Sequence, residues 1–148
     1  MTPHEMTQTL VAAGKSLIAV LDEESAALTE VRLSRVAELC EAKEAAAAHY
    51  ESIFKTASGN AELVAAAGAA DRHALSAVKS DLDRAAVRNV NALRAAMEMN
   101  RRLMQTIATS IERQRLSASG YTKTGAAYQR AHAPKAGDTL SVSLNKTF

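Results

Sequence analysis

The apolar residues near the start of the chain recur with helical spacing. Leu10, Leu17, Leu21 and Leu28 are seven, four and seven residues apart, so they share one face of a helix. The stretch TPHE before them resembles a helix start, because its threonine can cap, its proline suits the first turn and Glu5 can complete a capping box. Asp22, Glu23 and Glu24 are neighbours along the helix and point apart, so we interpret them as a solvated surface rather than a carboxylate pair.

A second apolar pattern starts after TEVRLSRVAEL, where β-branched and polar residues weaken the helix. We predict a break near residues 30–34, with Ser34 as a possible cap for the next helix. The pattern that follows repeats nearly every seven residues, as in coiled coils, and comprises Val36, Leu39, Cys40, Lys43, Ala47, Tyr50 and Phe54. On this stripe Cys40 is expected as a small core residue, and Lys43 as a side chain whose ammonium reaches water.

The stretch TASGN at residues 56–60 predicts a stop, with Gly59 in the left-handed conformation and Asn60 capping the next helix. Helical periodicity then runs to about Leu116, and a continuous helix over residues 61–117 would be roughly 85 Å long. A helix of that length needs a packing partner, which the first half of the chain can provide. We therefore predict an all-α protein, a long antiparallel hairpin or bundle over residues 1–117, followed by a flexible tail over residues 118–148 that is rich in Gly, Ser and Thr.

Charge is unevenly distributed between the two halves. Residues 1–60 have a net charge of −4 and residues 61–120 a net charge of +3, which suits antiparallel packing. Five arginines lie between residues 84 and 104 without interleaved aromatics, so we favour a charged outer face over nucleic-acid binding. Asn89 and Asn100 fall on the apolar face of this helix, where a buried asparagine can fix register; a position at its wet edge is the alternative.

The sequence offers no arrangement suited to catalysis. The four histidines are far apart, the single cysteine excludes an intrachain disulfide, and no glycine-rich phosphate loop occurs. We therefore expect no enzyme activity, no metal and no cofactor. The chain has neither a secretory signal nor a run approaching a membrane span, so we expect a cytoplasmic protein without stable membrane insertion.

Several of these features occur together in the order found in one family. The chain resembles the FlgN family of flagellar export chaperones over nearly its whole length, with a Leu–Glu–Leu first helix, a Leu-x-x-x-Lys segment, an asparagine-containing late helix and a tyrosine–glycine element. The matching positions are Leu21, Glu24 and Leu28, Leu39 and Lys43, Asn89 and Asn100, and Tyr121 and Gly125. The alanines at residues 45–48 depart from the leucines usual in that family.

The resemblance implies a cytosolic chaperone that binds hook–filament junction (hook-associated) proteins and delivers them to the flagellar type III export gate. It also implies a client site towards the C-terminus and gate docking by Tyr121 and Gly125. The client-binding candidates combine apolar residues with a basic flank and are Met97, Arg101, Arg102, Leu103, Met104, Ile107 and Ile111. Burial of the same apolar residues inside the hairpin is the competing expectation. The alternative function is a structural coiled-coil or surface-coating protein without a defined client, and we expect a monomer or weak homo-oligomer.

Overall fold

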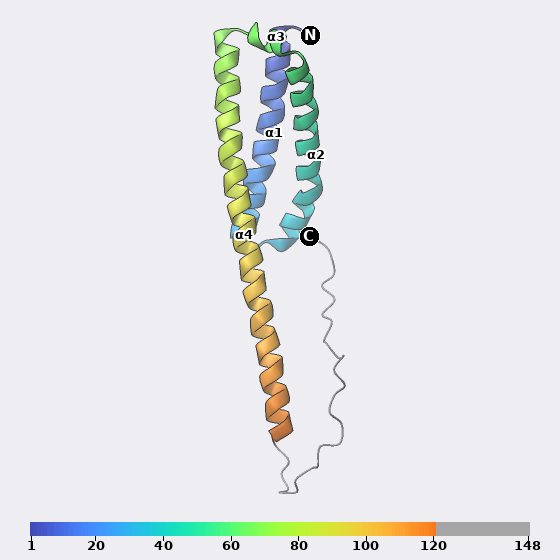
Figure 1. The fold of residues 1–148 in the computed structure, drawn as a ribbon, viewed down its shortest axis with the longest axis vertical. Helices are drawn as coiled ribbons and strands as arrows, with labels where there is room; N and C mark the ends of the chain where they lie inside the picture. Colours follow the sequence, from blue (N-terminus) through green and yellow to red (C-terminus); the bar gives the residue numbers. More distant parts are fainter. Residues whose placement is uncertain (121–148) are drawn as a thin grey trace. The chain divides into compact units, whose positions relative to one another are not determined.

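The computed structural model describes residues 1–120, and they form helices without any strand (Figure 1). The helices are α1 (Pro3–Thr29), α2 (Leu33–Gly59), the short α3 (Ala61–Ala65) and α4 (Ala69–Gly120). The long helices α1 and α2 pack side by side in opposite directions, which confirms the all-α antiparallel architecture predicted from the sequence. The chain divides into two units, residues 1–100 and residues 101–148, and of the second unit the structure describes residues 101–120.

Helix α1 begins with the predicted capping box. The Thr2 hydroxyl accepts a hydrogen bond from the backbone N–H of Glu5 at 3.2 Å, and the Thr2 N–H donates to Glu5 Oε2 at 2.7 Å. Pro3 occupies the first turn, where its missing N–H costs nothing. Two otherwise unpaired backbone donors are therefore satisfied at the helix start.

The connection between α1 and α2 lies where the sequence predicted a break. The N–H of Arg32 donates to the carbonyl of Ala27 at 2.8 Å and that of Val31 donates to Leu28 at 3.2 Å, a Schellman ending. Val31 adopts a φ of 57°, a left-handed conformation that a β-branched residue adopts only at a cost. Ser34 does not cap α2: Arg32 precedes the helix, and its side chain makes no capping hydrogen bond.

The second connection corrects three predictions. No continuous helix covers residues 61–117, because α3 ends at Ala65 and α4 begins only at Ala69. Gly59 is the last residue of α2 and is not left-handed, while the Asn60 amide donates back to the carbonyl of Thr56 at 2.8 Å instead of capping α3. Ala67 is buried in the intervening turn, so burial of this small side chain accompanies the interruption of the helix. Helix α4 then continues to Gly120, beyond the predicted end at residue 117.

The core of the first unit lies along α1, in three apolar clusters. Near the N-terminus Met6 and Leu10 pack with Ala57, followed by Leu17 and Leu21 with Ala85. The third cluster contains Ala27, Leu28, Val36 and Leu39, with Ala92, Leu93 and Ala96 packed against it. The leucine face predicted for the first helix is therefore the centre of the core.

Gly14 marks a close approach between α1 and α4. A Cβ atom added at this residue would lie 2.5 Å from Val78 Cγ1 and 3.6 Å from Tyr50 Cε2. Glycine in a helix interior costs about 1 kcal/mol relative to alanine. The contact with Val78 explains why the larger residue is disfavoured here.

Candidate functional site

A buried polar cluster joins the three long helices within the first unit. Lys43 Nζ on α2 lies 2.8 Å and 2.9 Å from the two carboxylate oxygens of Glu24 on α1. The amide of Asn89 on α4 donates to Glu24 Oε2, and it lies 3.4 Å from the carbonyl of Leu21. We call Glu24, Lys43 and Asn89 the polar junction.

The polar junction is deeply buried for a charged cluster. Glu24 is 2% exposed and Asn89 is 4% exposed, whereas the Lys43 side chain keeps 26% exposure. Among the described residues no buried side-chain nitrogen or oxygen lacks a hydrogen-bond partner. Removing one member of such a cluster leaves an uncompensated charge or donor, so the junction favours one alignment of the three helices.

For this cluster the structure corrects one prediction, completes a second and decides between two alternatives that the sequence left open. Glu24 is not part of a solvated surface, because it is 2% exposed. The Lys43 side chain keeps 26% exposure, but its ammonium pairs with Glu24 across two helices, which was not predicted. Asn89 is buried on the apolar face, as one of the two alternatives required, whereas Asn100 is exposed. The sequence pattern placed Lys43 on an apolar face, but it did not show that the carboxylate of Glu24 on another helix lies opposite to it.

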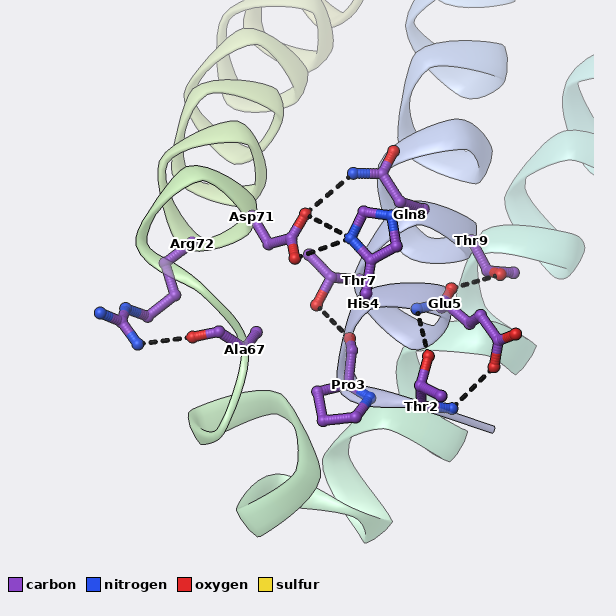
Figure 2. A network of polar contacts seen from close by, with 10 residues as sticks. All are labelled: Thr2, Pro3, His4, Glu5, Thr7, Gln8, Thr9, Ala67, Asp71 and Arg72. Carbon is purple, nitrogen blue, oxygen red and sulfur yellow. Dashed lines mark hydrogen bonds and ion pairs between the residues drawn. The ribbon is translucent and has the colours of Figure 1, made fainter.

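A second polar cluster connects the first turns of α1 and α4 (Figure 2). Asp71 Oδ2 and Oδ1 lie 2.9 Å and 3.0 Å from His4 Nδ1, and Oδ1 also accepts from the Gln8 amide at 3.0 Å. Because a carboxylate can only accept, Nδ1 is the protonated ring nitrogen of His4. The hydrogen bond from His4, followed by that from Gln8, lowers the pKa of Asp71.

The candidate client-binding residues lie on the C-terminal part of α4 and are largely exposed. Leu103, Ile107 and Ile111 are 56%, 44% and 44% exposed, and their spacing of four places them on one face. We call these three residues the apolar stripe. Met97 is 71% exposed and Met104 is half-buried, while Arg101 and Arg102 are exposed. Of the two sequence-based alternatives, the structure gives exposure rather than burial.

The remaining predicted residues are placed differently or fall outside the described range. Cys40 is exposed rather than part of the core, and its thiol lies 4.0 Å from Glu44 Oε1. The apolar repeat on α2 is therefore narrower than predicted, since Ala47 and Phe54 are also exposed. Tyr121 and Gly125, the proposed gate-docking residues, lie outside the residues that the structure describes.

A shallow groove was missed by sequence reasoning. It runs between α2 and α4, with Leu17 and Leu21 of α1 as its floor, and its walls are Lys43, Glu44, Ala47, Leu82, Asp83, Ala86 and Asn89. The exposed alanines in the α2 pattern were its only signal, because short side chains leave the space between two helices unfilled. The groove borders the polar junction, since Lys43 and Asn89 belong to both.

Comparison with known proteins adds no relative to these observations. No protein-family model, no curated protein and no solved structure matches the chain. Among residues 1–120, none of the helices has the length and apolar character needed to cross a membrane.

Proposed function

We propose that this protein is a cytosolic export chaperone that binds hook–filament junction proteins and delivers them to the flagellar type III export apparatus. The observation that carries the proposal is the apolar stripe. Three large aliphatic side chains are exposed on one helical face at residues 103, 107 and 111. An amphipathic helix of a client can bury such a face through contacts at the same spacing.

The basic character of the same segment favours a particular kind of client. Residues 101–120 contain four arginines and one glutamate. A client helix with acidic residues beside its apolar face would be attracted to this segment and oriented by it. Opposite charges at the edge of such an interface raise the association rate more than the affinity, which suits a partner that must later be released.

The positions that carry the FlgN resemblance also support the proposal. Glu24, Lys43 and Asn89 were matched to that family from three separate segments, and they are in direct contact. Leu28 and Leu39, two more matched positions, belong to one core cluster. A sequence pattern that specifies one three-helix arrangement requires contacts of this kind between its positions. A pattern of unrelated coiled-coil positions would not require these contacts.

The client proposal is tested by co-purification of the chaperone with hook–filament junction proteins encoded in the same genome. The decisive variant is Ile107→Asp, which places a charge in the middle of the apolar stripe. Its matched control is Thr109→Asp, an exposed residue on the opposite side of the same helix. We expect Ile107→Asp to weaken client binding at least tenfold and Thr109→Asp to leave it unchanged.

Different failures of this experiment have different meanings. If the unmodified protein binds no junction protein, the proposed function is wrong and the structural coiled-coil alternative gains support. If it binds and Ile107→Asp binds equally well, the function stands but the apolar stripe is not the client surface. Gate docking is tested separately with Tyr121→Ala, which should reduce motility and gate binding while client binding stays intact.

A further inference from the structure

The groove between α2 and α4 is an apolar surface that no helix of the first unit covers. Its floor is formed by Leu17 and Leu21, and the alanines of its walls, Ala47 and Ala86, are exposed. Short side chains on both walls allow another helix to approach the leucine floor closely. The groove therefore has the form of the missing position in a four-helix bundle.

We propose that this groove binds the C-terminal part of α4 from a second copy of this chain, with the apolar stripe facing the leucine floor. The proposal goes beyond client binding and does not depend on it. Among the described residues, the two surfaces are complementary: the apolar stripe presents exposed aliphatic side chains, and the groove presents an apolar floor. Docking between copies buries both.

The dimensions of the two surfaces agree. The apolar stripe spans residues 103 to 111, about 12 Å along a helix. The groove wall on α4 runs from Leu82 to Asn89, about 10 Å at the same rise per residue. The three aliphatic side chains of the stripe therefore match the length of the groove, and all three can be covered by it.

Charge favours the same pairing. The docking segment, residues 101–120, has a net charge of +3, whereas the groove walls contain Glu44 and Asp83. The third charged wall residue, Lys43, is held by Glu24 within the polar junction. Asp83 forms an ion pair with Lys79 at 3.1 Å. Because both side chains are exposed, this pair contributes little to stability, and an arginine of the incoming helix can replace Lys79 as the partner of Asp83.

The interface would be small, so association should be weak and dependent on concentration. Contacts of this size fall in the low range of protein–protein interfaces, where affinities are commonly micromolar or weaker. Reciprocal docking gives a closed pair, and one-directional docking gives open chains. Either form places the apolar stripe of one copy against the groove of another.

The first test is sedimentation of the full-length protein from about 1 μM to its solubility limit, a range chosen to include weak association. We expect larger species at high concentration, lost in Ile107→Asp on the stripe and in Ala86→Arg in the groove. The controls are Thr109→Asp and Ala95→Arg, exposed residues on the opposite sides of the same helix, and both should associate like the unmodified protein. Ala86→Arg leaves the stripe intact, so client binding by this variant separates the two proposals.

The second test identifies the surfaces in contact. One protein carries Cys40→Ser with Ala86→Cys, and the other carries Cys40→Ser with Ser110→Cys beside the stripe. On oxidation of the mixture we expect a mixed disulfide, at least tenfold more abundant than when Ala95→Cys replaces Ala86→Cys.

Three outcomes would overturn the proposal. The first is a protein that stays monomeric at its solubility limit. The second is association abolished by Ile107→Asp but unaffected by Ala86→Arg, since stripe would then pair with stripe. The third is equal cross-linking by the Ala86→Cys and Ala95→Cys proteins.

Discussion

Two stretches of α4 have similar apolar spacing and opposite surroundings. In the first unit Val78, Ala85 and Asn89 are buried against α1. In the second unit Leu103, Ile107 and Ile111 keep 44% to 56% of their surface exposed. Apolar periodicity thus indicates where a helix requires a partner. It does not indicate whether the same molecule provides that partner, and this distinction separates a structural face from a binding face.

The largest loss of stability is expected for a substitution in the buried stretch of α4. Ala85 has no exposed surface and packs with Leu17 and Leu21, so Ala85→Asp places an unpaired carboxylate in the core. We expect a loss of about 3–5 kcal/mol in the free energy of unfolding, enough to unfold a marginal protein. Urea denaturation followed by circular dichroism measures it. A loss below about 1 kcal/mol would mean that this part of α4 is not held by α1.

The next largest loss of stability is expected in the polar junction, because it is buried beside the first stretch of α4 and contains charged groups. Lys43→Met leaves the Glu24 carboxylate without its cation, and we expect a loss of about 2–4 kcal/mol. Lys55→Met is the control, since Lys55 forms only an exposed pair with Glu51 on the same helix. Adding Glu24→Gln to Lys43→Met should restore part of the stability, and additive losses in the double variant would contradict the pairing.

Sequence reasoning recovered the fold because its elements depend on local signals. The capping box at Thr2, the break near residue 30 and the leucine face of α1 were all predicted, and all are present. The short helix α3 was not predicted, since the turn after Ala65 lies within a stretch whose alanines are equally compatible with a continuous helix. Local propensity does not specify where burial of a small side chain such as Ala67 interrupts a helix.

The candidate site was recovered less completely. The three residues of the apolar stripe were among the client-binding candidates, but the sequence was compatible with their burial as well as their exposure. The pairing of Glu24 with Lys43 was missed, because the two residues belong to different helices and only their packing brings them together. The groove was missed for a related reason: it is formed by what alanines leave empty between α2 and α4.

Gly14 tests how closely the buried stretch of α4 is held. Gly14→Ala improves helix propensity, yet the added Cβ would meet Val78 Cγ1 at 2.5 Å. We expect a net loss of about 1–3 kcal/mol, because valine is stiff and the helices must separate slightly. Gly59→Ala is the matched control, since nothing lies within 4 Å of its added Cβ. Thermal unfolding measures both variants, and Gly59→Ala should not lower the stability. If Gly14→Ala also left the stability unchanged or raised it, the close approach of the two helices would be contradicted.

Asp71 allows a smaller, pH-dependent test at the first turn of α4. Its pKa is lowered in the folded protein, chiefly by the hydrogen bond from His4, so the charged form stabilises the fold. This contribution is complete above the ordinary aspartate pKa of about 4, and it is lost as the pH falls through the lowered value. The stability difference between the unmodified protein and Asp71→Asn should therefore shrink between pH 5 and pH 2. Asp81→Asn, at a carboxylate paired only with Arg84 on its own helix, is the control. A difference that stayed constant with pH would exclude the His4 contact.

The smallest effect on stability is expected for a substitution in the exposed stretch of α4. Ile107→Asp is chemically similar to Ala85→Asp and lies in the same helix, but its side chain is 44% exposed. We expect a change within about 0.5 kcal/mol, since an exposed carboxylate remains hydrated and the lost contacts are few. Denaturation curves of the two variants, measured at low concentration to exclude self-association, make the comparison direct. If Ile107→Asp instead cost several kcal/mol, the stripe would be covered within the monomer. Both the client site and docking between copies would then lose the exposed surface on which they rest.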